Sequence, residues 1–393
     1  MKIEGFSFSA VKAGVRYKDR LDIGLIYSDK PVVTVGTFTK NLVKAAPVLI
    51  DIERLKNGSA QAILVNSGNA NACTGQPGME ASLATSRLLA EELEIDEKLI
   101  QLSSTGVIGE LLNVEAFENG IKPLVKGLSP DNFEKVAEAI MTTDTVKKVC
   151  YHSVDIDGVT VRFMGMAKGA GMIMPNMATM LSFVLTDAQI GFVELKTALQ
   201  ASVDRTFNRI TVDGDTSTND MVLVMANGAA KNEWIEENSK AAEQFQTGLE
   251  HVFKDLALQI VSDGEGASKC VTIRVCGARE DEDAEQMART IANSPLVKTA
   301  FFGEDANWGR IIAAMGRSGV RFNPDHVDIA FGDVLLVKDG LAVGGDAEER
   351  ATDILKGKNI NICIDLRDGP NCEEVYTCDF SIDYVKINAD YRS

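Results

Sequence analysis

The stretch KGAGMIMPNMATML, residues 168–181, joins a glycine-rich turn to the start of an apolar run. The glycines favour a flexible turn over 168–175, and the apolar residues of 180–185 favour a strand. Thr179 stands where the two meet. A rigid strand after it and a strained turn before it would press the Thr179 hydroxyl against the carbonyl of Ala178. The spacing fits a threonine that attacks its own chain, although a purely structural turn fits it as well.

Strand and helix patterns alternate on both sides of this stretch. A helix is predicted over 79–93, and another around Leu249, Val252, Phe253, Leu256 and Ile260, which lie on one helical face. The second helix should end at residues 262–264, with Gly264 as a left-handed cap. Runs of branched and apolar residues predict strands at 62–65, 159–166, 180–185, 221–225, 327–331, 361–366 and 374–380. Strands that neighbour one another in sequence favour mixed α/β layers over an all-parallel, doubly wound sheet.

Length and charge narrow the class of protein. The chain has 393 residues, of which 45% are apolar, enough for about two domains or one large one. It carries 40 Lys and Arg against 57 Asp and Glu, a net charge of −17. Such a chain repels phosphate backbones and anionic lipid, so neither nucleic acid nor membrane is an expected partner. With no long apolar span and no signal-like start, the expected location is cytoplasmic.

The cysteines agree with a cytoplasmic location, and the histidines limit the possible catalytic groups. The cysteines are odd in number and lack any C-x-x-C pair, which predicts free thiols in a reducing compartment. They are Cys73, Cys150, Cys270, Cys276, Cys363, Cys372 and Cys378. The only histidines, His152, His251 and His326, are far apart in the chain. A histidine zinc site or a Ser-His-Asp triad is therefore not expected, and the base of an enzyme would have to be another group.

Standard cofactor motifs fail on inspection. Residues 168–174 begin like a dinucleotide fingerprint, but the last glycine is replaced by Met174, and no phosphate-binding P-loop occurs. Residues 213–218 resemble the start of a calcium loop, yet Thr218 and Val224 stand where glycine and glutamate are required. Neither a metal nor an organic cofactor is expected.

Hydroxyl residues gather beside glycine and asparagine at several turns: 103–106, 141–145, 176–181 and 216–219. Each cluster alone is typical of a cap or turn. Together, in a chain so poor in histidine, they suggest threonine nucleophile chemistry. Threonine can use its own α-amino group, of pKa about 8, as the base. An internal threonine must first be freed, which here requires a cut between Ala178 and Thr179 through an ester intermediate.

Residues 168–181 resemble the self-cleavage signature of the glutamate N-acetyltransferase family, also called ornithine acetyltransferase, of arginine biosynthesis. Further strings follow in the family's order over nearly the whole chain. They are residues 66–75, 103–109, 141–145, 208–220, 263–267, 305–310 and 387–393.

The resemblance implies a mixed α+β fold of the α/β class, a layered sandwich of the ornithine acetyltransferase type with a smaller C-terminal lobe. Self-cleavage would give a fragment 1–178, with the oxyanion hole and part of the substrate site. The fragment 179–393 would carry the threonine nucleophile, the rest of the site and the smaller lobe. The two fragments would stay associated, in an α2β2 assembly.

The resemblance also assigns roles to single residues. Thr179 would be the nucleophile and its freed amine the general base, while the Thr105 hydroxyl and the Gly106 N–H would form the oxyanion hole. A small Thr-Gly pair at a turn suits donors that converge on a developing negative charge. Whether Thr142 or Thr143 contacts the substrate is left open. The substrate-binding positions implied are Thr142, Lys168, Thr179, Glu265, Asn388 and Ser393.

The charges of the implied substrates agree with these positions. N2-acetylornithine and glutamate share an α-carboxylate, which Lys168 would bind. The side chain of ornithine ends in an ammonium that Glu265 would pair with. That of glutamate ends in a carboxylate, for which Asn388 and Ser393 offer neutral donors.

The implied reaction is a ping-pong transfer. Thr179 takes the acetyl group from N2-acetyl-L-ornithine as an ester, and the amine of L-glutamate then removes it. Acetyl-CoA would be a second donor in a bifunctional member that also has amino-acid N-acetyltransferase activity. Two other functions stay open: an amidohydrolase or aminopeptidase of the same self-cleaving architecture, and a non-catalytic binding or scaffold protein.

Overall fold

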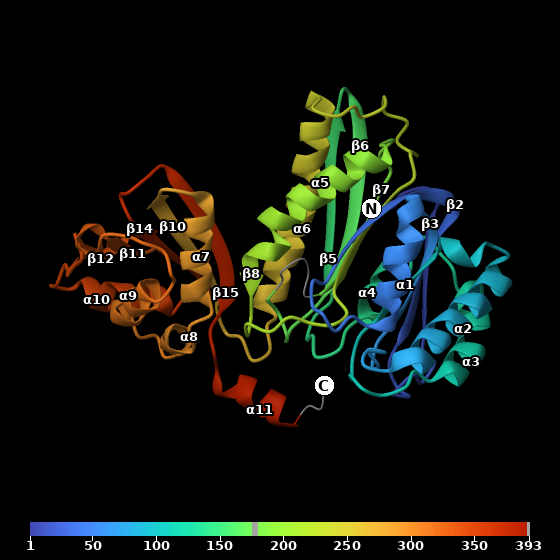
Figure 1. The fold of residues 1–393 in the computed structure, drawn as a ribbon, viewed down its shortest axis with the longest axis horizontal. Coiled ribbons are helices and arrows are strands. Elements are labelled where there is room, and N and C mark those ends of the chain that lie inside the picture. The colour runs from blue at the N-terminus through green and yellow to red at the C-terminus, as the bar shows by residue number, and fades with distance from the viewer. Residues whose placement is uncertain (175–179, 391–393) are drawn as a thin grey trace.

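The structure, a computed structural model, describes residues 1–174 and 180–390. Ala178, Thr179 and Ser393 lie outside the described residues. The described chain forms two lobes, each built around one mixed sheet, and the C-terminal lobe is the smaller (Figure 1). The predicted mixed α/β class with a smaller C-terminal lobe is confirmed.

The sheet of the larger lobe has the strand order β4-β3-β2-β9-β7-β6-β5, with β1 paired to β2 at one side. The β3–β4 and β7–β9 pairs are parallel, and the other neighbours are antiparallel. Its strands are β1 (Phe6–Val11), β2 (Ile23–Phe38), β3 (Ser59–Asn66), β4 (Ile100–Ser104), β5 (Lys148–Ile156), β6 (Val159–Lys168), β7 (Leu181–Thr186) and β9 (Met221–Ala226). Strands β7 and β9 follow residue 179 in the chain, yet they lie between β2 and β6, which precede it.

Helices cover both faces of this sheet. On β7, Leu181 and Phe183 face a core shared with α1 (Ala46–Arg54) and α4 (Phe133–Ala139). Val184, which follows Phe183 and lies on the opposite face of the strand, packs with α5 (Phe192–Arg205) and α6 (Lys240–Ser262). Every residue of β7 and β9 is buried, as expected of strands covered on both sides. Helices α2 (Gly75–Leu93) and α3 (Val114–Lys126) pack against the end of the sheet that carries β3 and β4.

The smaller sheet has the order β13-β12-β11-β14-β10-β15-β8. Its elements are β8 (Ile210–Thr211), β10 (Cys270–Ala278), α7 (Asp281–Ala292), α8 (Pro295–Phe302), α9 (Trp308–Gly316), β11 (Asp328–Phe331), β12 (Val334–Lys338), β13 (Leu341–Ala342), α10 (Ala347–Leu355), β14 (Asn359–Asp365) and β15 (Asn371–Cys378). The short strand β8, which lies between β7 and β9 in sequence, joins this sheet beside β15. The last helix, α11 (Ile382–Asp390), leaves the smaller lobe and runs back toward the larger one (Figure 1).

The predicted strands and both predicted helices are present, with small shifts at their ends. Helix α6 is longer than its apolar face indicated and begins after Ser239, whose hydroxyl accepts a hydrogen bond from the N–H of Ala242. The predicted left-handed cap at Gly264 is wrong. Asp263 ends the helix by donating its N–H to the carbonyl of Gln259, and the left-handed glycine is Gly266, with φ 68°.

The expectation of seven free thiols is also wrong. Cys276 on β10 and Cys372 on β15 form a disulfide, although they are 96 residues apart. The two residues are direct partners in the antiparallel register of these strands, so their side chains lie on the same side of the sheet. Sequence spacing carries no sign of this pairing. The remaining cysteines are free.

Candidate active site

One cavity brings together residues that the sequence analysis selected from distant parts of the chain. It lies where the loop after β4, the loop after α4, the end of β6, the turn after α6 and helix α11 meet. The predicted residues that line it are Thr105, Gly106, Thr142, Lys168, Glu265 and Asn388. Thr143 lines it too, so the choice between Thr142 and Thr143 stays open.

Two hydrogen-bond donors of the predicted oxyanion hole have no partner among the described residues. The N–H groups of Thr105 and Val107 donate to the carbonyls of Asn66 and Gly68, at 3.0 and 3.3 Å. Within the described chain, no such bond is formed by the N–H of Gly106 between them or by the Thr105 hydroxyl. Both groups line the cavity and can therefore bind a negatively charged oxygen there.

Glycine is required at position 106 for two reasons. Its φ of 131° is unfavourable for any residue with a side chain. A Cβ atom on Gly106 would also lie 2.5 Å from the backbone nitrogen of Asn69. The close approach of the two loops thus excludes even alanine and keeps the Gly106 N–H at the cavity.

Asparagine side chains hold in place the loop over residues 104–107, named here the oxyanion loop. The Nδ2 of Asn219 donates to the carbonyls of Ala70 and Ser104, at 2.6 and 2.8 Å. Asn66 accepts from the Ser104 hydroxyl at 2.7 Å and donates to the carbonyl of Asn69 at 2.9 Å. The turn over residues 66–71, which is rich in glycine and asparagine, therefore supports the site. Asn219 lies within the family string 208–220, but the sequence alone assigned it no role.

Lys168, at the end of β6, supplies a cation to the cavity. Its Nζ donates to the Oγ1 of Thr142 at 3.3 Å. Burial lowers the pKa of Lys168, and the attraction of Asp144, Asp220 and Glu265 opposes that effect. A lysine beside a threonine hydroxyl suits the binding of a carboxylate.

A buried ion-pair network fixes the position of this lysine and threonine. The Nζ of Lys148 lies 2.6 Å from Asp144 and 2.5 Å from Asp263, and the first two side chains are fully buried. Asp144 also accepts from the N–H of Thr142 at 2.9 Å and from that of Gly169 at 2.7 Å. Burial alone would raise the pKa of Asp144. Attraction to the two lysines and its hydrogen bonds outweigh burial, so the pKa lies below the ordinary 3.8.

Glu265 and Asn388 line the same cavity and contact each other. Asn388 on α11 donates to the Oε2 of Glu265 at 2.8 Å. The Glu265 carboxylate packs so closely on Gly171 that a Cβ there would lie 2.5 Å from its Oε1. The glycine-rich turn thus makes room for a carboxylate, and α11 brings its amide to the same place.

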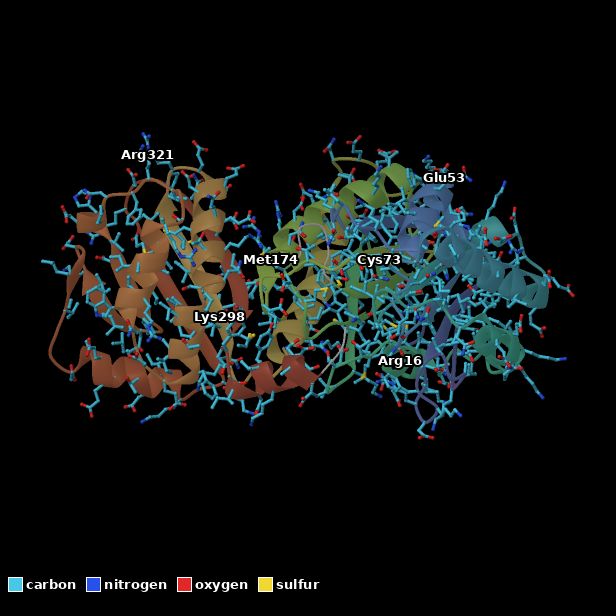
Figure 2. The ribbon with its side chains drawn as sticks, turned by 60° about the horizontal axis from the view of Figure 1, so that its bottom comes forward. Arg16, Glu53, Cys73, Met174, Lys298 and Arg321 are labelled. Atoms are coloured by element: carbon cyan, nitrogen blue, oxygen red, sulfur yellow. A yellow bond between two sulfur atoms is a disulfide. The ribbon has the colours of Figure 1, made fainter. Side chains whose placement is uncertain are left out.

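The chain is held on both sides of the predicted cleavage bond. Asp213 accepts from the N–H groups of Met172 and Ile173, at 2.6 and 2.9 Å. Met174 lies where the two lobes meet (Figure 2), and its carbonyl accepts from the hydroxyl of Thr216 at 3.0 Å. At residue 180, where the described chain resumes, the carbonyl of Met180 accepts a hydrogen bond from the N–H of Met221 at 3.0 Å. The segment from Asp213 to Met221, which connects β8 to β9, therefore anchors both flanks.

The described residues contain no group of three or more His, Cys, Asp or Glu side chains arranged to hold a metal ion. None of the helices in that part of the chain is both long and apolar enough to cross a membrane.

Unpaired donors beside a cation and a carboxylate in one cavity are the arrangement expected of an enzyme that moves an acyl group on a small charged molecule. The ArgJ family model matches residues 7–393. The chain belongs to the ArgJ family, and the expectation of an acyltransferase of arginine biosynthesis is thereby confirmed.

Individual relatives agree with this family. The arginine biosynthesis bifunctional protein ArgJ of Desulfotalea psychrophila is 74% identical, and that of Geobacter sulfurreducens 51% identical, each over 393 residues that cover both chains completely. A crystal structure of the arginine biosynthesis bifunctional protein ArgJ from Bacillus halodurans has 48% sequence identity to the present chain and a TM-score of 0.53. The match covers 54% of the present chain and all of the solved one.

Proposed function

We propose that the chain moves the acetyl group of N2-acetyl-L-ornithine to L-glutamate through an acetyl ester on Thr179. The observation that carries the proposal is the pair of unpaired donors, the Thr105 hydroxyl and the Gly106 N–H, in one cavity with Lys168 and Glu265. Donors fixed in advance stabilise the tetrahedral intermediate without reorganisation during the reaction.

The nucleophile of this proposal is made by a cut between Ala178 and Thr179. Two facts support it. The described chain is anchored by hydrogen bonds at Met174 and at Met180, the described residues on either side of the proposed cut. In addition, the solved relative from Bacillus halodurans matches over its full length and covers 54% of the present chain. The fragment from Thr179 to Ser393 is a similar share of the chain, 215 of 393 residues.

The reaction runs in two acyl steps. The Thr179 hydroxyl gives its proton to the freed amine and attacks the acetyl carbonyl, while Thr105 and Gly106 bind the oxyanion. The C–N bond breaks, and ornithine takes that proton from the amine. Glutamate then enters, its amine attacks the ester, and the Thr179 oxygen recovers a proton as N-acetylglutamate leaves.

Charge and position in the cavity support the following substrate contacts. Lys168 and Thr142 bind the α-carboxylate that both substrates share. Glu265 pairs with the side-chain ammonium of ornithine. For the side-chain carboxylate of glutamate, Asn388 supplies an amide donor, which in this structure is used by Glu265. Ser393 is the second neutral donor in the proposal and lies outside the described residues.

The assembly, second activity and location complete the proposal. The two fragments remain associated and pair as α2β2. Acetyl-CoA serves as a second acetyl donor to glutamate, a role that the word bifunctional in the names of the relatives supports. No cofactor takes part, and the enzyme works in the cytoplasm.

Denaturing gel electrophoresis with N-terminal sequencing tests the nucleophile. The protein should give two bands, and the second should begin Thr-Met-Leu-Ser. The Thr179→Ala variant should stay whole and inactive, whereas Thr179→Ser, which keeps a hydroxyl, should still be cut. An uncut wild-type chain after prolonged incubation would favour the scaffold alternative.

An assay without glutamate separates the transferase from the hydrolase. A transferase should release about one ornithine per active site and then stop until glutamate is added. Steady release of ornithine and free acetate without glutamate would instead identify an amidohydrolase of the same architecture.

A further inference from the structure

One carboxyl group in the cavity has no role so far. Asp220 directly precedes β9, lines the cavity and is only 2% exposed. Its Oδ2 is buried and has no hydrogen-bond partner among the described residues. A buried carboxyl oxygen without a partner is costly, so its presence beside a reaction site calls for an explanation.

The strand register places Asp220 close to Met180, the residue that follows the proposed nucleophile in the chain. Strands β7 and β9 are parallel, with Leu181 opposite Met221, and the Met221 N–H donates to the carbonyl of Met180. Asp220 therefore lies at the same end of its strand as Met180 does. Met180 also lines the cavity and directly follows Thr179 in the chain.

The surroundings of Asp220 suit a carboxyl group that can hold or release a proton. Ser217 and the positive charge of Lys168 both favour the charged form of this carboxyl group. Glu265 is the other charged side chain on the cavity wall. Burial raises the pKa of Asp220 well above its ordinary value, against the opposing effect of Ser217 and Lys168. Burial therefore favours the protonated form of this carboxyl group, whereas Lys168 and Ser217 favour the carboxylate.

We propose that Asp220 stores one proton between the two half-reactions: it gives the proton to departing ornithine and receives one from arriving glutamate. This inference rests on the proposed acetyl-threonine function. Ping-pong transfer needs such a proton store, because the amine of ornithine must gain a proton before the amine of glutamate has brought one.

The protons balance as follows. When the amide C–N bond breaks, the ornithine nitrogen carries one proton and takes a second from the Thr179 hydroxyl through the freed amine. It leaves as ammonium after taking a third from the Asp220 carboxyl, which becomes a carboxylate. Glutamate enters as ammonium and returns one proton to Asp220. Its neutral amine attacks the ester, and the next proton it loses goes to the Thr179 oxygen.

Proton uptake in a single turnover tests this role. Wild type and Asp220→Asn are mixed with N2-acetylornithine, without glutamate, in weak buffer with a pH indicator. Wild type should form the acetyl-enzyme with Asp220 supplying the proton, so the variant should take up about one more proton from solvent per acetyl group. The loss of a positioned acid should also lower the variant's kcat by about 100-fold or more.

Asp51→Asn is the matched control. Asp51 is likewise fully buried, has an unpartnered Oδ2, and has a pKa raised well above its ordinary value by burial, but it does not line the cavity. This control should match wild type in proton uptake and kcat. Equal uptake by Asp220→Asn and wild type would overturn the role of Asp220.

Two further readouts keep the outcomes distinct. Mass spectrometry of the wild type shows whether Thr179 is acetylated; its absence would overturn the proposed function itself, whereas acetylation with equal uptake overturns only the role of Asp220. If Asp220→Asn is not cut, Ser217→Ala decides. Because Ser217 lowers the pKa of Asp220, its loss should raise that pKa and move upward the pH at which proton uptake from solvent begins; an unmoved transition overturns the inference.

Discussion

At the scale of single residues, Gly106 is the position where backbone shape and chemistry depend on each other most directly. Gly106→Ala would force a Cβ into the backbone of Asn69 at a φ of 131°. We expect a clear fall in thermal stability together with loss of acetyl transfer, because the oxyanion loop must move.

Gly109→Ala is the matched control for that experiment. Gly109 also has a positive φ, 85°, but a Cβ there would meet nothing within 4 Å. It should cost only the backbone strain of about 1–2 kcal/mol and leave the transfer rate nearly unchanged. Differential scanning calorimetry and a transfer assay on both variants check this, and equal effects of the two would contradict the packing argument.

The sequence predicted the cavity residues far better than their supports. Thr105, Lys168 and Glu265 could be selected from motif strings, because the family resemblance assigns them roles. Asn219 could not, since it acts on Ala70 and Ser104, 149 and 115 residues away in the chain. Hydrogen bonds over such separations leave no local pattern, so only the fold reveals which asparagine is a support.

At the scale of elements, the contact between β5 and α6 depends on the buried Lys148. Lys148→Met would leave Asp144 and Asp263 without their cation in the interior. Breaking a buried pair in this way costs about 3–5 kcal/mol of unfolding free energy. Urea unfolding should show that loss, together with weaker substrate binding, because Asp144 also positions Thr142.

The neighbouring lysine is a control for the same measurement. Lys147 pairs with Glu134 at 3.0 Å, but both side chains are well exposed, at 39% and 52%. Lys147→Met should change the unfolding free energy by no more than about 1 kcal/mol. A similar loss in both variants would mean that burial of the Lys148 network matters little.

Acid should weaken the same element contact. The pKa of Asp144 is lowered in the folded protein below its ordinary 3.8, so the carboxylate contributes stability at neutral pH. That contribution should be lost as the pH falls from about 4 through the folded-state pKa. Urea unfolding at stepped pH values should show it, and Lys148→Met should lose less over this range than wild type. An equal acid loss in both would show that other carboxylates dominate.

The β10–β15 pair predicts a thiol count. With Cys276 and Cys372 joined, five of the seven cysteines should react with a thiol reagent in denaturant. All seven should react after reduction. Seven reactive thiols in freshly purified, unreduced protein would show that the pair is open in solution, as a reducing compartment would favour.

Elements were easier to predict than their partners. The apolar runs at 180–185 and 221–225 indicated strands correctly, because branched residues buried on both faces have a strong local signature. Their parallel pairing, and the disulfide register on β10 and β15, depend on contacts between distant segments. Strand β8 is only two residues long and has no such signature at all.

At the scale of the whole molecule, the order of the larger sheet determines how the two pieces would hold together. Strands β7 and β9 lie between β2 and β6, so a cut before residue 179 leaves β2–β9 and β6–β7 ladders joining the fragments. Both fragments should elute in one peak in gel filtration and separate only in denaturant. Separation under native conditions would contradict this strand order in solution.

The insertion of β7 and β9 into the middle of that sheet has a consequence for the life of the enzyme. A cut in the chain between β6 and β7, made after the sheet has formed, costs the native molecule little, but it removes the covalent link that brought the central strands together during folding. Once unfolded, the halves must find each other as separate molecules, so recovery becomes dependent on concentration and competes with aggregation. Maturation would then be a step taken once, and each mature copy would be replaced by new synthesis and not by repair.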